Sequence, residues 1–104
     1  MAQFDVFVNP ILGARRAYPY VVILQSDFAS GARDSLVAPL VPRAGLSTVA
    51  GRLAPIVIVE GSEHAVLVPA MTGLRSADLS KRCASIASAR DEVLAAIDHL
   101  FFGA

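Results

Sequence analysis

Apolar and polar side chains alternate near the start of the chain. Within residues 3–8, every second side chain is apolar: Phe4, Val6 and Val8. A period of two residues predicts a β-strand with one buried face. A β-branched run at 20–25 predicts a second strand. The loop between them, which contains Pro10, Gly13 and the Arg15-Arg16 pair, favours a hairpin.

Three more strands are predicted in the middle of the chain. Residues 35–41 read as a strand that Pro39 and Pro42 confine to an edge or a bulge. Residues 56–59 and 65–68 flank a polar, Gly-containing turn at 60–63, which predicts a second hairpin. Residues 43–54, which lie between the strands at 35–41 and 56–59, combine helical spacing with two glycines, so their structure stays open.

The C-terminal part of the chain changes to a helical pattern. Residues 79–102 contain no Gly or Pro. Apolar residues recur there at steps of three and four: Ile86, Ala89, Val93, Ile97 and Leu100. Ser80, Ser85 or Ser88, the last with Asp91 three residues on, are possible starts, and Gly103 suits a left-handed C-cap. We expect one domain over 1–104, mainly antiparallel β with a C-terminal helix.

The composition is apolar for a chain of this size. Of 104 residues, 55% are hydrophobic and 17% charged, so part of the apolar surface is expected to lie in a homodimer interface. Nine basic and nine acidic residues balance, which gives no global field to attract nucleic acid. Without a signal-peptide pattern, a membrane-length apolar run or a second cysteine beside Cys83, a cytoplasmic location is expected.

No pattern of catalytic or metal-binding residues stands out. His64 and His99 lack ligand spacing to any partner, and structural roles are favoured for both. Cys83 falls on the apolar side of the predicted helix, which indicates a structural thiol. Arg15-Arg16 and Arg33 could contact phosphate, although solvated loop charges are commoner. We therefore expect no enzyme activity, metal or cofactor.

The two adjacent phenylalanines near the end of the chain are the exception. Phe101 and Phe102 cannot both face inward on a helix, because neighbouring positions are about 100° apart. One is expected to continue the buried stripe. The other is exposed, packs across a dimer interface, or anchors a binding partner.

Ordered blocks of sequence carry a family resemblance. They are QFDVF at 3–7, VILQSD at 22–27, LVAPL at 36–40, LAPIVIVEGSEH at 53–64, ADLS at 77–80 and AAIDHLFFGA at 95–104. In these blocks the chain resembles the CcdB-type toxins, the toxin half of plasmid and chromosomal ccd toxin–antitoxin modules. The resemblance runs nearly end to end, with one longer first loop.

The resemblance implies an SH3-like barrel with a C-terminal helix, shared by CcdB and MazF toxins, and a homodimer. It also implies a function without chemistry: the toxin binds the A subunit of DNA gyrase and traps its complex with cleaved DNA. A CcdA-like antitoxin, disordered when free, neutralises it. Contact with DNA is then only indirect, through the topoisomerase or the antitoxin.

Residue by residue, the resemblance assigns target binding to seven positions: Asp98, Phe101, Phe102, Gly103, Ala104, Phe28 and Ala29. Phe102 replaces a Trp and Ala104 a terminal Ile, while Phe28 and Ala29 replace two aliphatic residues. These changes remove aromatic and apolar area from the anchor. Topoisomerase IV as the target, or an inactive relic that only binds antitoxin, therefore stay open beside gyrase. A MazF-type endoribonuclease is a further alternative, disfavoured by the net charge of zero.

Overall fold

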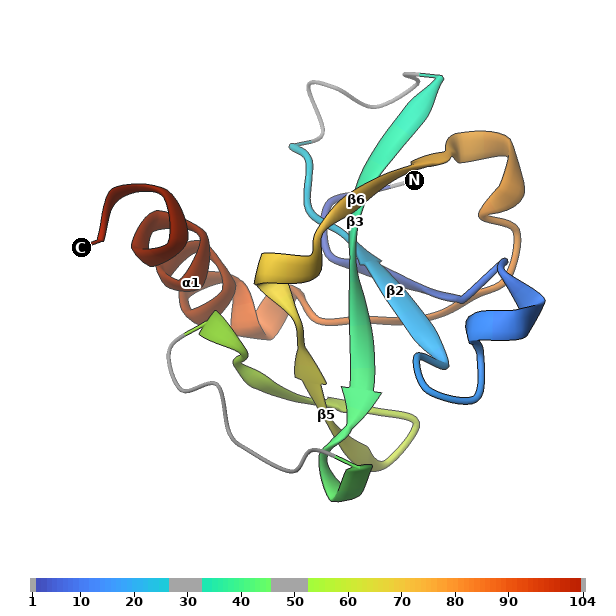
Figure 1. The fold of residues 1–104 in the computed structure, drawn as a ribbon, viewed down its shortest axis with the longest axis horizontal. Coiled ribbons are helices and arrows are strands. Elements are labelled where there is room, and N and C mark those ends of the chain that lie inside the picture. Colours follow the sequence, from blue (N-terminus) through green and yellow to red (C-terminus); the bar gives the residue numbers. More distant parts are fainter. Residues whose placement is uncertain (1, 27–32, 46–52, 104) are drawn as a thin grey trace.

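The computed structural model describes residues 2–26, 33–45 and 53–103. In them, seven antiparallel strands form one curved, half-barrel sheet that is followed by an α-helix (Figure 1). The strands are β1 (Asp5–Val8), β2 (Tyr20–Ile23), β3 (Asp34–Pro42), β4 (Ile56–Val59), β5 (Ser62–Val66), β6 (Thr72–Arg75) and β7 (Arg82–Ser85), and the helix is α1 (Arg90–Phe102). The predicted fold, mainly β with a C-terminal helix, is confirmed.

The long strand β3 organises the sheet, whose order is β4-β5-β3-β2-β1-β7. β2 pairs along one side of β3. On the other side, β6 pairs with residues 34–37 of β3 and β5 pairs with residues 40–42. Figure 1 shows β6 crossing over β3. β3 is therefore a central strand.

The prediction that Pro39 and Pro42 confine this strand to an edge or a bulge is wrong. Pro39 lies in the interval between the residues that pair with β6 and those that pair with β5. Its carbonyl accepts a hydrogen bond from the Leu67 amide at 2.9 Å. Because the N–H and C=O of one residue point to the same side of an antiparallel strand, the missing N–H of Pro39 falls in that interval. Pro42 ends the strand.

β1 and β2 bury both of their faces, whereas alternation predicted a single buried face for β1. The inner face joins the main core, which includes Phe4, Val6, Val22 and Leu40. The opposite face carries a second cluster, formed by Phe7, Val21, Ile23, Val37 and Leu79. Leu79 follows β6 along the chain, and the half-buried Leu74 of β6 packs against the same cluster. A segment distant in sequence thus covers a face that the local pattern left open to solvent.

The C-terminal helix is shorter than its sequence pattern predicted. Residues 82–85 form β7, which pairs with β1, and a 3₁₀ turn at Ala87–Ala89 leads into α1. Cys83 therefore lies on a strand and packs against the main core. A helix start at Ser88, with Asp91 completing a capping box, does not form. The N-cap is Ala89, which makes no side-chain hydrogen bond to the helix. Pairing with β1 overrides the local helix preference.

The predicted hairpin at 56–68 is present, with a tighter turn than expected. β4 and β5 pair from Ile56–Ala65 to Val59–Ser62, so the loop contains only Glu60 and Gly61. Both have positive φ, 52° and 78°, as a type I′ turn requires. This geometry matches the twist of the flanking strands and fixes their register.

Gly61→Ala is expected to lower the free energy of unfolding by about 1 kcal/mol, since a Cβ disfavours the left-handed backbone. Gly73→Ala is the matched control: Gly73 also has open space for a Cβ but no positive φ. Urea unfolding of both variants measures the difference. Equal stabilities for the two variants would contradict this interpretation of the turn.

Candidate functional site

The aromatic pair lies at the exposed end of α1. Phe101 is 62% exposed and Phe102 78% exposed. Their ring centroids are 6.5 Å apart, with the planes inclined by 55°. The prediction that one ring continues the buried stripe is therefore wrong. The two rings present an apolar surface that no described part of the chain covers.

The packing of α1 explains why both rings are exposed. Val93 and Ala96, in the first two turns, are fully buried in the main core. Ile97 packs only partly against that core, and Leu100 is already exposed. Figure 1 shows the last turn of α1 projecting away from the sheet. The helix is thus anchored by its first half and displays its second half.

Gly103 ends the helix as predicted. It adopts a left-handed conformation, with φ of 69°, and its N–H donates to the His99 carbonyl at 3.0 Å. This C-cap fixes the direction of the chain after Phe102. Asp98 is exposed on the same helix. We call Asp98, Phe101, Phe102 and Gly103 the tail surface. The other predicted contacts, Phe28, Ala29 and Ala104, lie outside the described residues.

The remaining candidate residues have structural surroundings. His64 is buried, its Nδ1 donates to the Ser62 carbonyl at 3.0 Å, and Tyr20 packs edge-on against its ring at 5.3 Å. The Cys83 thiol donates to the Val6 carbonyl at 3.5 Å. Burial raises the pKa of the Cys83 thiol, and the nearby Glu60 charge adds to this. A thiol held in its neutral form is a poor nucleophile.

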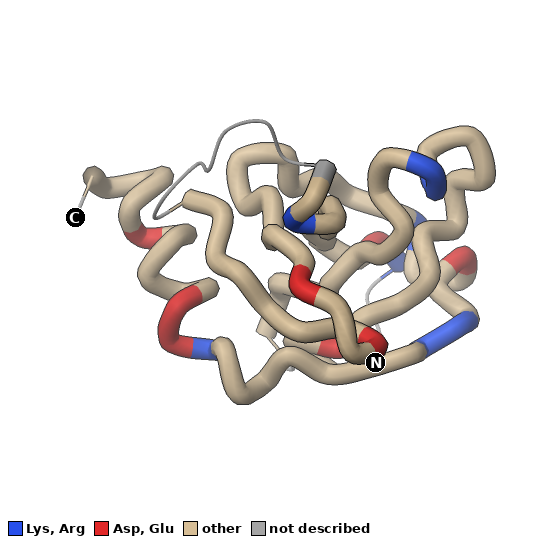
Figure 2. Tube along the Cα trace, turned by 90° about the horizontal axis from the view of Figure 1, so that it is seen from below, with Lys and Arg blue, Asp and Glu red and all other residues tan. Residues whose placement is uncertain are grey.

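Most Lys and Arg positions lie toward the end of the molecule away from α1, with Asp and Glu positions among them (Figure 2). Two of the arginines pair with carboxylates: Arg82 with Asp5 at 3.1 Å and Arg43 with Glu63 at 3.0 Å. Groups of three or more residues able to bind a metal ion do not occur in the described part of the chain. It contains no helix long and apolar enough to cross a membrane.

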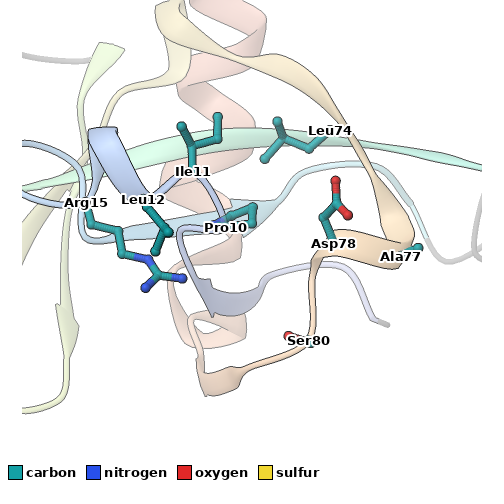
Figure 3. Close-up of a pocket in the computed structure, with 8 residues that line it drawn as sticks. All are labelled: Pro10, Ile11, Leu12, Arg15, Leu74, Ala77, Asp78 and Ser80. Atoms are coloured by element: carbon teal, nitrogen blue, oxygen red, sulfur yellow. The ribbon is translucent and has the colours of Figure 1, made fainter.

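A groove beside the first loop was not predicted from the sequence (Figure 3). Its volume is about 610 Å³, and Pro10, Ile11, Leu12, Leu74, Ala77 and the polar Arg15, Asp78 and Ser80 line it. Buried Asn9 holds the loop in place: its side chain accepts from the Ile11 amide at 3.0 Å and donates to the Tyr18 carbonyl at 2.9 Å. Arg15 donates to the Asn9 carbonyl. The one sequence signal was the apolar Ile11-Leu12 pair within a polar loop.

Comparison with known protein families identifies a match. A family model described as CcdB protein matches residues 3–103, nearly the whole chain. No curated protein shows significant similarity to the chain. The matched range includes β1, the whole sheet and α1 through Gly103.

Cys83 is expected to react slowly with iodoacetamide at pH 8. Burial raises the pKa of its thiol, so the folded protein holds less thiolate than the unfolded chain at that pH. Alkylation in the absence of urea should be slower than in 8 M urea, by about tenfold or more. Mass spectrometry over time measures both rates. Equal rates would indicate an accessible, reactive thiol and would reopen the search for a nucleophilic role.

Proposed function

The chain belongs to the CcdB family, and we propose that it poisons a bacterial type II topoisomerase through its tail surface. Family membership makes the chain the toxin of a toxin–antitoxin module. The finer proposal is that it binds the A subunit of DNA gyrase and holds the enzyme on cleaved DNA. The observation that carries this proposal is the exposure of both Phe101 and Phe102 at the end of an anchored helix.

Exposing two adjacent aromatic rings to water is unfavourable. Contiguous apolar surface on a soluble protein usually marks an interaction site. Aromatic side chains are frequent anchors in interfaces, because they bury a large area and have few rotatable bonds to immobilise. The Gly103 cap and the packing of Val93 hold the helix before any partner binds. Such preorganisation reduces the entropy lost on association.

A toxin acting in this way needs no catalytic group. Its effect depends on binding tightly to one state of the topoisomerase, in which DNA is cut and covalently held. A ligand that prefers one state raises the population of that state by mass action. The described residues supply a binding surface for this task, with Asp98 as a polar neighbour of the two rings.

A homodimer is part of the proposal. Two copies related by a two-fold axis present two equivalent tails, which suits a topoisomerase that is itself two-fold symmetric. The high apolar content and exposed side chains such as Leu36 and Ile58 are consistent with a further buried interface. A CcdA-like antitoxin is the expected neutralising partner.

The replacement of Trp by Phe102 bears on which topoisomerase is bound. Phe102 offers a smaller ring and no N–H donor. Two targets follow from this. Either the chain binds gyrase through an anchor of smaller aromatic area, or it binds the related topoisomerase IV. A MazF-type endoribonuclease finds less support, because nine basic and nine acidic residues give the chain a net charge of zero.

Light scattering after size exclusion is expected to give a mass near twice 10.9 kDa for the purified protein. The measurement should cover the micromolar range, where a stable dimer does not dissociate. A mass of 10.9 kDa throughout that range would remove the homodimer from the proposal.

The functional test is DNA cleavage by purified gyrase and, in parallel, by topoisomerase IV. We expect linear DNA to accumulate with one of the two enzymes, and Phe102→Ala to reduce the potency by tenfold or more, about 1.4 kcal/mol. Leu12→Ala is the matched control, since Leu12 is 74% exposed. The 3₁₀ turn that contains it, Leu12–Ala14, lies at the opposite end of the molecule from the last turn of α1 (Figure 1). Leu12→Ala should keep full potency.

Three results would contradict the proposal in different ways. Cleavage that persists unchanged in Phe102→Ala would remove the tail surface as the anchor. No cleavage with either enzyme would leave a member of the family that only binds its antitoxin. Degradation of bulk messenger RNA by the purified protein would favour the endoribonuclease alternative.

A further inference from the structure

His99 has an unusual environment on the last turn of α1. Its ring is half-buried, and its Nδ1 atom is fully buried without a hydrogen-bond partner within residues 2–26, 33–45 and 53–103. The other histidine, His64, uses its Nδ1 to donate to a carbonyl. Nδ1 of His64 must therefore carry a proton, whereas a proton on Nδ1 of His99 would have no acceptor within the described residues.

The buried Nδ1 of His99 decides which nitrogen carries the proton. A neutral imidazole has one N–H donor and one acceptor nitrogen. A buried donor without an acceptor loses its hydrogen bond to water and gains none in return, so a proton on Nδ1 is disfavoured. Buried acceptors without a partner are tolerated more often than buried donors. The structure assigns the Nε2–H tautomer to His99, with the donor on the other edge of the ring.

That donor lies beside the tail surface. His99 precedes Phe102 by three residues, and side chains at this spacing are neighbours on a helix. The His99 carbonyl accepts the N–H of Gly103 in the C-cap, so ring and tail are fixed to the same helical turn. Phe101 and Phe102 carry no polar side-chain atoms, and an ionised Asp98 can only accept. Within that last turn, Nε2 of His99 is the side-chain donor.

We propose that His99 is a specificity-determining residue of the tail surface, whose ring donates from Nε2 to an oxygen of the bound protein. The acceptor is a backbone carbonyl or a carboxylate. This inference rests on the proposed binding of a topoisomerase by the tail. It adds a hydrogen-bond donor to a surface that otherwise offers two apolar rings and the acceptor Asp98, and such a contact distinguishes partners that present an acceptor from those that do not.

Two amide substitutions test the assignment. The amide nitrogen of Gln lies near the position of Nε2, whereas that of Asn lies near Nδ1. His99→Gln therefore keeps the donor and His99→Asn loses it. Binding to the A subunit that responds in the cleavage assay is measured by calorimetry. We expect His99→Gln to bind within about threefold of the native chain and His99→Asn to bind about tenfold more weakly.

Thermal unfolding of both variants controls for the fold. His99→Asn places an unpaired amide donor near the buried Nδ1 position, so we expect its midpoint to be the lower of the two, with both variants folded at the temperature of the binding measurement. If the two variants bind equally well, or if His99→Asn binds more tightly, the donor role is wrong even though the topoisomerase target stands. If the native chain binds neither A subunit, the proposed function fails instead. The tautomer is then decided by a long-range ¹H–¹⁵N spectrum of the free protein. A proton on Nδ1 there would overturn the inference independently of any target.

Discussion

The burial of Val93 and Ala96 against the inner face of the sheet determines where the functional groups lie. These two side chains hold the first half of α1 on the main core. Because the helix continues beyond the sheet, its last turn must be exposed, and the aromatic pair is exposed with it. The same packing keeps that turn from moving independently. An apolar anchor of this kind is ready to bind without reordering.

The sheet that supports this helix depends on contacts between distant segments. β7 joins the sheet by pairing with β1, and the Ile86 amide donates to the Phe4 carbonyl at 2.9 Å just before the helix begins. Phe4 itself has a positive φ of 71° and a buried ring. A bulky residue held in this conformation requires support from its surroundings. The start of the chain thus fixes the direction in which the C-terminal helix leaves the sheet.

Much of this fold could be predicted from local patterns, and the errors have a common cause. Alternation and turn residues located β1, β2 and the β4–β5 hairpin, since these depend on neighbours in sequence. Residues 82–85 have a helix-like composition, and only pairing with β1, more than seventy residues away, makes them a strand. The aromatic pair was recognisable in the sequence. The exposure of both rings was not, because it depends on where the sheet ends beneath α1. The groove at Ile11 likewise requires the chain after β6 to lie against the first loop.

Contact between the tail surface and a topoisomerase can be tested inside bacteria. The most direct measurement places a photoreactive phenylalanine analogue at position 102 and irradiates bacteria that produce the protein. Mass spectrometry then identifies what the residue touches. We expect a crosslink to the A subunit of gyrase or to its counterpart in topoisomerase IV. Crosslinks only to a second copy of the chain would contradict it, because Phe102 would then be part of the dimer interface.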